Sequence, residues 1–337
     1  MNKRIAILRE ESLQAVNRLS AERGLLVTKF YRELSAAEDS VPVQRAKAFE
    51  YILRHKSICI NEGELIVGER GPAPKATPTY PEINLHSLKD LEILNGREKV
   101  SFKVDEETRR AFEEEIIPYW TGRTNRERVF RNMEPSWIEA YEAGVFTEFQ
   151  EQRAPGHTVA GSKIYSQGME DLIREVQKSG KQLDLLSDPA AYEKREELRA
   201  MEIAARALIM FAERHAEALE KLASEEENPE RREELKQMAA ICRRVPAQAP
   251  KSMHEAVQYY WFVHLGVITE LNPWDSFNPG RLDQHLLPFY RADLKSGLLD
   301  KDLAIELLQS FWIKFNNHPS PPKVGVTAEE SNTYTDF

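Results

Sequence analysis

The stretch MHEAVQYYWFVHLGVITEL, residues 253–271, is apolar on nearly every side of a helix. Ser252 and Glu255 have the spacing of a capping box at its start, which predicts that a helix begins there. A helix without a broad polar face is typical of the interior of a large protein. The stretch therefore predicts a large globular protein with a buried central helix.

The composition agrees with a globular chain. Its 337 residues are 41% hydrophobic and 30% charged, which is enough to bury a sizeable core and excludes a disordered chain. The length fits about two domains or one large one. A net charge of −9 argues against nucleic acid as the main partner. The sequence contains no run of 18 apolar residues, so no membrane span is predicted. The apolar run at residues 5–8 is too short for a signal peptide.

Cysteine is scarce, with only Cys59 and Cys242 in the chain. Two distant cysteines exclude a disulfide framework and a cysteine-rich zinc site. Neither has an activating partner nearby in sequence, although the fold could bring one from elsewhere. A reducing, cytoplasmic location is the expectation.

Helices are predicted along most of the chain. Asp188 and Pro189 suit the start of a long helix at 189–226, and Asn228-Pro229 separates it from a second helix at 230–244, as in an antiparallel hairpin. A short apolar run at 64–69 predicts a strand, and four prolines within 71–82 exclude a helix there. Further helices are predicted at 43–55, 106–119, 126–137, 282–292 and 303–315.

Three loops interrupt the helical pattern with residues that suit chemistry. The first contains Phe149 and Ala154-Pro155-Gly156-His157-Thr158. The Pro-Gly turn fixes the backbone just before His157, whose imidazole exchanges protons near neutral pH and suits acid or base work. The alternative is a histidine that only hydrogen-bonds its own loop, which is the commoner role for a loop histidine.

The second loop is Asn272-Pro273-Trp274-Asp275-Ser276-Phe277-Asn278-Pro279-Gly280-Arg281. Two Asn-Pro steps stiffen it, and its aromatic residues can screen Asp275 from water. A screened carboxyl group tends to stay protonated and can donate a proton to a leaving hydroxyl. The alternative is that Asp275 caps a helix or pairs with Arg281.

The third loop, Ser331-Asn332-Thr333-Tyr334-Thr335-Asp336-Phe337, combines hydroxyl groups with a carboxylate. Ser331 and backbone N–H groups suit a substrate carboxylate, and Asp336 suits an ammonium, so the loop could bind a zwitterion. The alternative is an ordinary polar turn.

Other candidates favour structural roles. His254 and His264 lie on the predicted buried helix, where satisfied core histidines are commoner than metal ligands. The aromatic run at 259–262 indicates core packing. The sequence has neither the His-Glu-x-x-His spacing of a helical zinc site nor a glycine-rich phosphate loop.

Taken together, the three loops and the stretch Asn61-Glu-Gly-Glu-Leu-Ile-Val-Gly-Glu69 resemble the N-terminal part of glycyl radical enzymes, the superfamily of pyruvate formate-lyase and glycerol dehydratase. The resemblance covers essentially all 337 residues. Within the superfamily, the likeness is greatest to the members that dehydrate hydroxyproline. The expected fold is α/β, the mostly helical N-terminal portion of a ten-stranded α/β barrel, with short strands near residues 64–68 and 323–327.

The resemblance also implies site roles. His157 and Asp275 would assist departure of the C4 hydroxyl of hydroxyproline as water. Ser331 and the backbone N–H of Phe337 would hold the substrate carboxylate. Asp336 would hold the ring nitrogen, and the rings of Phe149 and Phe337 would wall the pyrrolidine. No metal ligand is implied in this chain.

The radical machinery of the family is missing from this sequence. Neither a Gly-Cys-Val-Glu loop nor an Arg-Val-Ala-Gly loop is present. Residues 1–337 are therefore expected to form the N-terminal part of a pyruvate formate-lyase-like domain, a fragment that binds no cofactor itself and is inactive alone. The resemblance implies that a glycyl radical in the missing part is installed by an activating enzyme that uses S-adenosylmethionine and an iron-sulfur cluster, and that the complete enzyme is an anaerobic, cytoplasmic homodimer.

Three functions stay open at this point. The first is radical dehydration of trans-4-hydroxy-L-proline to pyrroline-5-carboxylate by the complete enzyme. The second is another glycyl radical lyase or acyltransferase, such as a diol dehydratase. The third is a non-catalytic helical protein derived from such an enzyme.

Overall fold

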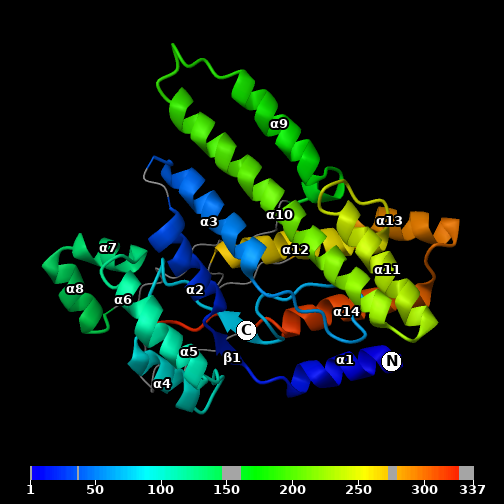
Figure 1. The fold of residues 1–337 in the computed structure, drawn as a ribbon, viewed down its shortest axis with the longest axis horizontal. Helices are drawn as coiled ribbons and strands as arrows, with labels where there is room; N and C mark the ends of the chain where they lie inside the picture. The colour runs from blue at the N-terminus through cyan, green and yellow to red at the C-terminus, as the bar shows by residue number, and fades with distance from the viewer. Residues whose placement is uncertain (1, 36–37, 146–160, 272–278, 326–337) are drawn as a thin grey trace.

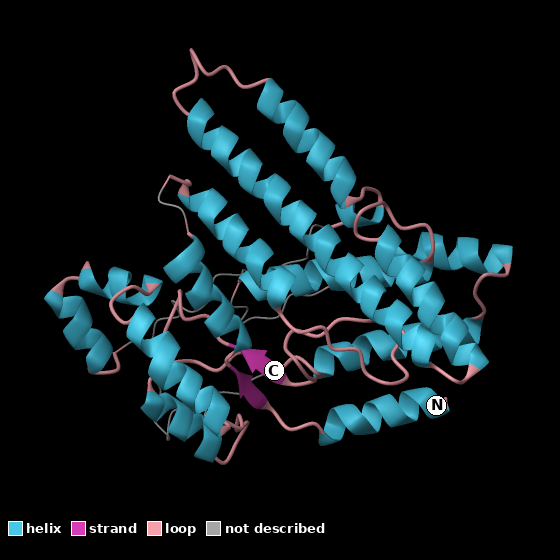
Figure 2. Ribbon diagram, viewed as in Figure 1, coloured by secondary structure: helices cyan, strands magenta, loops and turns pink. Residues whose placement is uncertain are grey.

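The structure is a computed structural model that describes residues 2–35, 38–145, 161–271 and 279–325. Within these ranges, helices dominate and two short strands form a small sheet (Figure 2). Strand β1 (Arg18–Ser20) pairs in parallel with β2 (Ala76–Pro78). A mostly helical chain with a few short strands is what the sequence predicts, but the strands lie at other positions.

Helix α12 (Met253–Glu270) is the buried centre of the larger core. Trp261, Phe262 and Leu265 are completely enclosed. At its start, Ser252 Oγ accepts a hydrogen bond from the Glu255 N–H at 3.2 Å. The Glu255 carboxylate accepts from the Lys251 N–H instead of that of Ser252, and Arg244 also bonds it, so only half of the predicted capping box forms.

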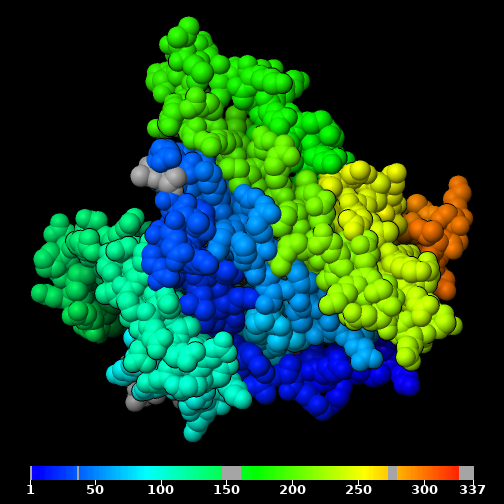
Figure 3. Space-filling model, viewed as in Figure 1, coloured from blue at the N-terminus to red at the C-terminus, as the bar shows by residue number. Residues whose placement is uncertain are grey.

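Two long helices cross over α12. Helix α10 (Ala191–Glu225) begins two residues later than predicted, because Asp188 accepts the N–H of Ala190 in a preceding turn. Helix α11 (Pro229–Arg244), capped by the Asn228 side chain, returns antiparallel along α10 as predicted (Figure 1). Helix α9 (Met169–Lys181) runs beside the first half of α10. The α9–α10 turn protrudes from the body of the molecule, as the space-filling view shows (Figure 3).

A second, smaller core lies around α2 (Glu22–Lys29) and the segment from α4 (Leu88–Gly96) to α6 (Ile117–Trp120). Trp120 closes it, and its indole Nε1 donates to Thr28 Oγ1 at 2.8 Å. The neighbouring prediction of one helix over 126–137 is wrong. The chain forms α7 (Asn125–Arg131) and then α8 (Pro135–Glu142), because a proline suits the first turn of a helix and breaks its interior.

The predicted strand at 64–68 is also wrong. The backbone there is held by side chains of α12. Gln258 bonds both the N–H and the carbonyl of Val67 at 2.9 Å, and the Trp261 indole donates to the Gly68 carbonyl at 2.9 Å. These bonds satisfy backbone groups of an apolar segment that pairs with no strand among the described residues. The predicted strand at 323–327 is absent from its described part, residues 323–325.

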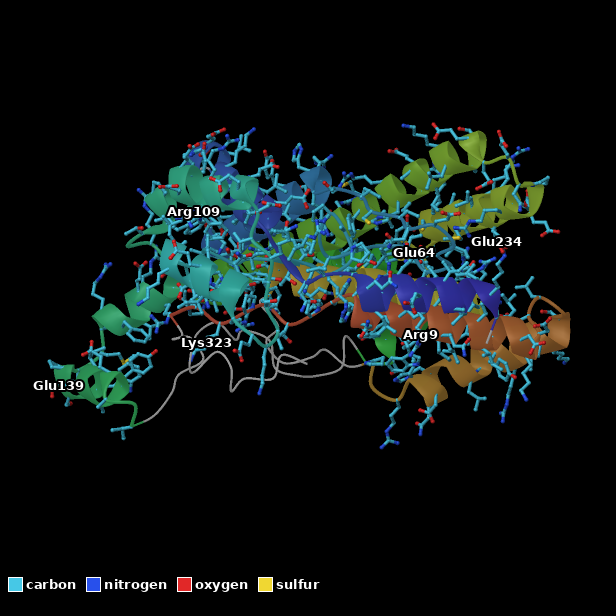
Figure 4. All side chains as sticks on the ribbon, turned by 90° about the horizontal axis from the view of Figure 1, so that it is seen from below. Arg9, Glu64, Arg109, Glu139, Glu234 and Lys323 are labelled. Atoms are coloured by element: carbon cyan, nitrogen blue, oxygen red, sulfur yellow. The ribbon has the colours of Figure 1, made fainter. Side chains whose placement is uncertain are left out.

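Helix α1 (Lys3–Gln14) lies along α14 (Lys301–Asn316), as the view from below shows (Figure 4). Among the described helices, none is both long and apolar enough to cross a membrane. The remaining elements are the π-helical turns η1 (Phe30–Leu34) and η2 (Phe112–Ile116), the 3-10 turn η3 (Lys163–Tyr165), and the helices α3 (Val41–His55), α4 (Leu88–Gly96), α5 (Glu106–Ala111), α6 (Ile117–Trp120) and α13 (Leu282–Ser296).

Candidate functional site

The six predicted site residues lie outside the described residues. They fall in three ranges, 146–160, 272–278 and 326–337, so their mutual arrangement stays a prediction. The described residues include segments that border these ranges. We call each set of contacts that fixes such a segment an anchor, and the anchors together the frame of the candidate site. The residues concerned are Phe149 and His157, then Asp275, and finally Ser331, Asp336 and Phe337.

The first anchor fixes the end of α12, which leads into the range that contains Asp275. The Tyr80 hydroxyl donates to the Ile268 carbonyl, and Arg23 Nε donates to the Thr269 carbonyl at 2.6 Å. The Glu270 carboxylate pairs with Arg45. The last carbonyls of a helix lack hydrogen-bond donors within the helix. Tyr80 and Arg23 supply those donors, and together with Arg45 they fix the C-terminal end of α12.

Arg23 is itself held on several sides. Its guanidinium forms a pair with Glu82 at 2.5 Å, lies over the Tyr80 ring at 4.1 Å, and donates to the Thr79 carbonyl. Burial raises the pKa of Tyr80 to about 12, so its hydroxyl remains a donor at neutral pH. The anchor is therefore a connected network centred on the buried Arg23 and Tyr80 and not a single contact.

The second anchor holds the end of α14. The Lys314 ammonium lies 2.6 Å from Glu64 Oε1 and 2.5 Å from Glu69 Oε1, and His318 Nε2 lies 2.9 Å from Glu69 Oε2. All four side chains are buried. Burial by itself would raise the pKa of Glu69, but Lys314 and His318 outweigh it and lower that pKa to about 2. Glu69 is therefore a carboxylate in the folded chain.

The same cluster leads into the third range. Arg70, next to Glu69, donates to the Pro319 carbonyl and to Thr77 Oγ1. Farther along, the N–H of Gly325 donates to Asp90 Oδ1 at 3.0 Å. The chain is thus fixed from Lys314 to Gly325, immediately before the range that contains Ser331, Asp336 and Phe337.

The third anchor follows the first range. The Tyr165 ring stacks on His285 at a centroid distance of 4.9 Å, and the Tyr259 hydroxyl donates to the Gln167 carbonyl at 2.9 Å. Tyr259 belongs to α12 and His285 to α13, the two helices that flank the second range. The structure therefore brings the residues after 146–160 against both helices that border 272–278.

Sequence reasoning missed the partners in these anchors. The stretch Asn61–Glu69 is noticed by resemblance, but nothing in its pattern indicates Lys314, which is 245 residues beyond Glu69. Arg23 and Tyr80 likewise stand in ordinary local contexts. A signal could come only from knowing which distant residues vary together.

The two histidines on α12 differ in their hydrogen bonding. His254 Nε2 bonds the Leu65 carbonyl at 2.7 Å, which confirms the prediction of a satisfied core group. His264 is buried and stacks on Trp261 at 4.9 Å, but its Nδ1 has no hydrogen-bond partner among the described residues. Burial lowers the pKa of both imidazoles. The prediction for His264 therefore holds for its place in the core and not for its hydrogen bonding.

The two cysteines have environments unsuited to a reactive thiolate. Cys59 is partly buried and Cys242 is buried. Burial raises the pKa of both thiols, that of Cys59 to about 12. Over the part of the chain that the structure describes, no group of three or more His, Cys, Asp or Glu residues could hold a metal ion.

The chain is similar in sequence and in structure to hydroxyproline dehydratases. The chain is 49% identical over 330 residues to a trans-4-hydroxy-L-proline dehydratase from Clostridioides difficile, covering 98% of the chain and 42% of that protein. A crystal structure of hydroxyproline dehydratase from the same organism, with trans-4-hydroxy-L-proline bound, matches with a TM-score of 0.95 and 48% identity over 100% of the chain and 43% of that protein.

Other glycyl radical enzymes match less closely. The B12-independent glycerol dehydratase of Clostridium butyricum gives a TM-score of 0.89 with 28% identity, covering 96% of this chain and 40% of that one. A glycyl radical enzyme from Archaeoglobus fulgidus gives 0.86 with 31% identity, covering 94% and 40%. These matches confirm the predicted fold class, a mostly helical portion of the glycyl radical enzyme fold.

The chain spans less than half the length of each of these relatives. The family model for pyruvate formate lyase-like proteins matches residues 1–337, the whole of the sequence. The chain therefore belongs to the pyruvate formate lyase-like family of glycyl radical enzymes.

Proposed function

We propose that the complete enzyme, which joins this chain to the regions that its longer relatives have in addition, dehydrates trans-4-hydroxy-L-proline to pyrroline-5-carboxylate. The observation that supports this substrate is a difference in sequence identity. Two solved structures match the fold of this chain about equally well, but one is much more similar to it in sequence than the other. The chain is 48% identical to the hydroxyproline dehydratase and 28% identical to the glycerol dehydratase.

The proposed roles of this chain are binding and proton transfer. Ser331 and the Phe337 N–H hold the substrate carboxylate, and Asp336 holds the ring nitrogen. His157 and Asp275 assist loss of the C4 hydroxyl as water, because protonation turns a poor leaving group into a good one. Phe149 and the Phe337 ring enclose the pyrrolidine and exclude water from the site.

The residues of this chain do not supply the radical. The sequence lacks both radical loops, and the two cysteines that it does contain, the partly buried Cys59 and the buried Cys242, stand in other sequence contexts. We propose that the missing regions carry the glycine and the cysteine, and that a separate activating enzyme using S-adenosylmethionine and an iron-sulfur cluster installs the radical. We also propose that the complete enzyme is a homodimer located in the cytoplasm.

The test uses the complete, activated enzyme under anaerobic conditions. Turnover of hydroxyproline is expected to fall by at least about 100-fold in Asp275→Asn and in His157→Gln, the usual scale of a general acid's contribution. Asp283→Asn, an exposed carboxylate on α13, is the matched control and is expected to keep turnover. Turnover of glycerol but not of hydroxyproline would favour a diol dehydratase and refute the proposal.

A further inference from the structure

An apolar groove lies where α12 meets the helices α3 and α10, and we call it the α3–α10–α12 groove. Helix α3 runs beside α10, and α12 crosses the pair (Figure 1). The groove has a volume of about 520 Å³. Among the described residues that line it, Arg45, Glu197 and Glu270 are charged and the others are apolar. Arg45 and Glu270 pair with each other, so the groove offers a mainly apolar surface.

Small residues leave this space open between the three helices. A Cβ atom at Gly266 of α12 would lie 2.5 Å from Leu208 Cδ2 and 3.5 Å from Phe49 Cζ, so α12 touches both neighbours closely at this glycine. Beside this contact, α10 presents Ala200 and Ala204 to the groove. Their methyl groups are too short to fill the gap between helices, so a groove remains next to a tight contact.

The groove is open to solvent in this chain. Val41 is 71% exposed and Met201 is 44% exposed, and both line it. Phe49 and Leu208, which also line it, are 6% and 9% exposed. An apolar surface that stays open on a folded protein marks a site where another surface binds. The groove is therefore an interface that lacks its partner in residues 1–337.

The similarity to longer proteins indicates where this partner comes from. The hydroxyproline dehydratase structure matches 100% of this chain with a TM-score of 0.95, but the chain covers only 43% of that protein. The walls of the groove therefore belong to a fold that continues in longer members of the family. Regions that continue the fold have to pack on the apolar surfaces that this chain leaves open.

The position of the groove along the chain points to the same partner. Leu271, the last described residue before the range 272–278, lines the groove. Asp275 follows four residues later, and four residues span at most about 14 Å. The radical cysteine and glycine that we assign to the missing regions have to reach a substrate at Asp275. Those regions therefore approach the groove.

We propose that, in the complete enzyme, a segment of the same polypeptide from outside residues 1–337 fills the α3–α10–α12 groove with apolar side chains. The contact covers Val41 and Met201 and joins the missing regions to the end of α12. The closeness to Asp275 rests on the proposed function, whereas the open apolar groove does not depend on it.

Photo-cross-linking of the complete enzyme tests the proposal. Irradiation of the variant Met201→p-benzoylphenylalanine is expected to join residue 201 to a peptide outside residues 1–337, identified by mass spectrometry. Subunits labelled with nitrogen-14 and nitrogen-15 are mixed, so that a bond within one polypeptide is distinguished from a bond between two. Tyr192→p-benzoylphenylalanine, at a residue of α10 that is 56% exposed and outside the lining, is the control and is expected not to label that peptide.

Three results of this experiment would overturn the proposal. They are a bond to residues 1–337, a bond to another subunit, and no bond to any peptide, as expected if a small molecule or solvent occupies the groove. Neither turnover nor the identity of the substrate enters the measurement. A failure of the proposed function would therefore be seen in the turnover assay and not here.

Substitutions in the complete enzyme give a second readout. Met201→Glu is expected to lower the midpoint of thermal unfolding by at least about 2 °C, because a carboxylate would be buried against apolar side chains. Met201→Leu keeps the apolar surface and is expected to stay within about 1 °C of wild type. Leu222→Glu, at a residue of α10 that is 39% exposed and outside the lining, is the matched control. A shift for Met201→Glu no greater than that for Leu222→Glu would contradict a covered groove.

Discussion

The buried charge of Lys314 contributes to the stability of the folded chain. It lies between Glu64 and Glu69, which come from a segment far away in sequence, and it is 2% exposed. Removing one partner from a buried ion pair is strongly destabilising, because the other charges remain buried without compensation. The residue therefore joins α14 to the segment that begins at Asn61.

Replacing Lys314 by methionine is expected to lower the free energy of unfolding by about 3–5 kcal/mol. Urea unfolding of the 337-residue chain, followed by circular dichroism, measures the change. The matched control is Lys236→Met, whose side chain on α11 is 56% exposed and which is expected to stay within about 0.5 kcal/mol of wild type. A loss below about 1 kcal/mol for Lys314→Met would contradict the prediction.

His215 predicts a pH dependence of stability. Burial lowers its pKa to about 3, well below the ordinary value of 6.5, and its Nδ1 bonds the Phe211 carbonyl at 2.8 Å. Between these two pKa values the unfolded chain binds a proton that the folded chain does not. The stability that His215 contributes is therefore complete above about pH 6.5 and is lost as the pH falls toward 3.

His215→Asn is expected to reduce the fall in unfolding free energy between pH 6 and 5 by up to about 1.4 kcal/mol per pH unit relative to wild type. Urea unfolding at a series of pH values gives both slopes. Above pH 7.5 both slopes are expected to agree, which serves as the internal control. Identical slopes at pH 5–6 would show that His215 does not titrate differently on unfolding.

At the scale of elements, the end of α12 is fixed by residues from α2, α3 and the segment after β2. Tyr80→Phe removes the hydroxyl that bonds the Ile268 carbonyl and leaves that buried group unpaired. The expected loss is about 1–2 kcal/mol in unfolding free energy. Tyr192→Phe, at a residue of α10 that is 56% exposed, is the control and is expected to change little. Equal effects of both substitutions would show that the bond to α12 contributes nothing.

The segment 64–68 depends on α12 in a different way. Gln258 satisfies both backbone groups of Val67, so Gln258→Leu strands a buried donor and a buried acceptor. The expected loss is about 2–4 kcal/mol, measured by urea unfolding. Gln237→Leu, an exposed position on α11, is the control. A loss for Gln258→Leu no greater than that of the control would mean that water replaces the side chain at no cost.

At the scale of the whole molecule, the described residues form two main cores and a small separate cluster of Val43, Ala46 and Ala200. The larger contains α9 to α14, and the smaller contains residues of α2 to α6. Helix α3 contributes residues to both, Phe49 and Leu53 to the larger and Ile52 to the smaller. All three anchors of the candidate site join segments distant in sequence, so the frame exists only when the whole described chain is folded.

The isolated 337-residue chain is expected to show no hydroxyproline dehydration and no glycyl radical signal. The reason is that its sequence contains neither radical loop. Anaerobic incubation with the activating enzyme, followed by electron paramagnetic resonance and product analysis, measures both. A glycyl doublet from this chain alone would contradict the assignment of the radical to the missing regions.

The sequence by itself determined the helical character, the buried centre and the family. Spacing of apolar residues locates α3, α10, α11, α12, α13 and α14 to within a few residues, because helix periodicity is a local property. Short motifs carry the family resemblance, since their residue types are legible without coordinates. The arrangement of Phe149, His157, Asp275, Ser331, Asp336 and Phe337 stays a prediction from those motifs.

Only the tertiary structure decided which partners satisfy the backbone of segments outside the helices. The apolar run at 64–68 has the composition of a strand, but Gln258 and Trp261 bond it from α12, and the strands form at 18–20 and 76–78 instead. The charge cluster around Lys314 and the anchor around Arg23 likewise join residues hundreds of positions apart. Hydrogen bonds and ion pairs act through space, so a local pattern cannot reveal them.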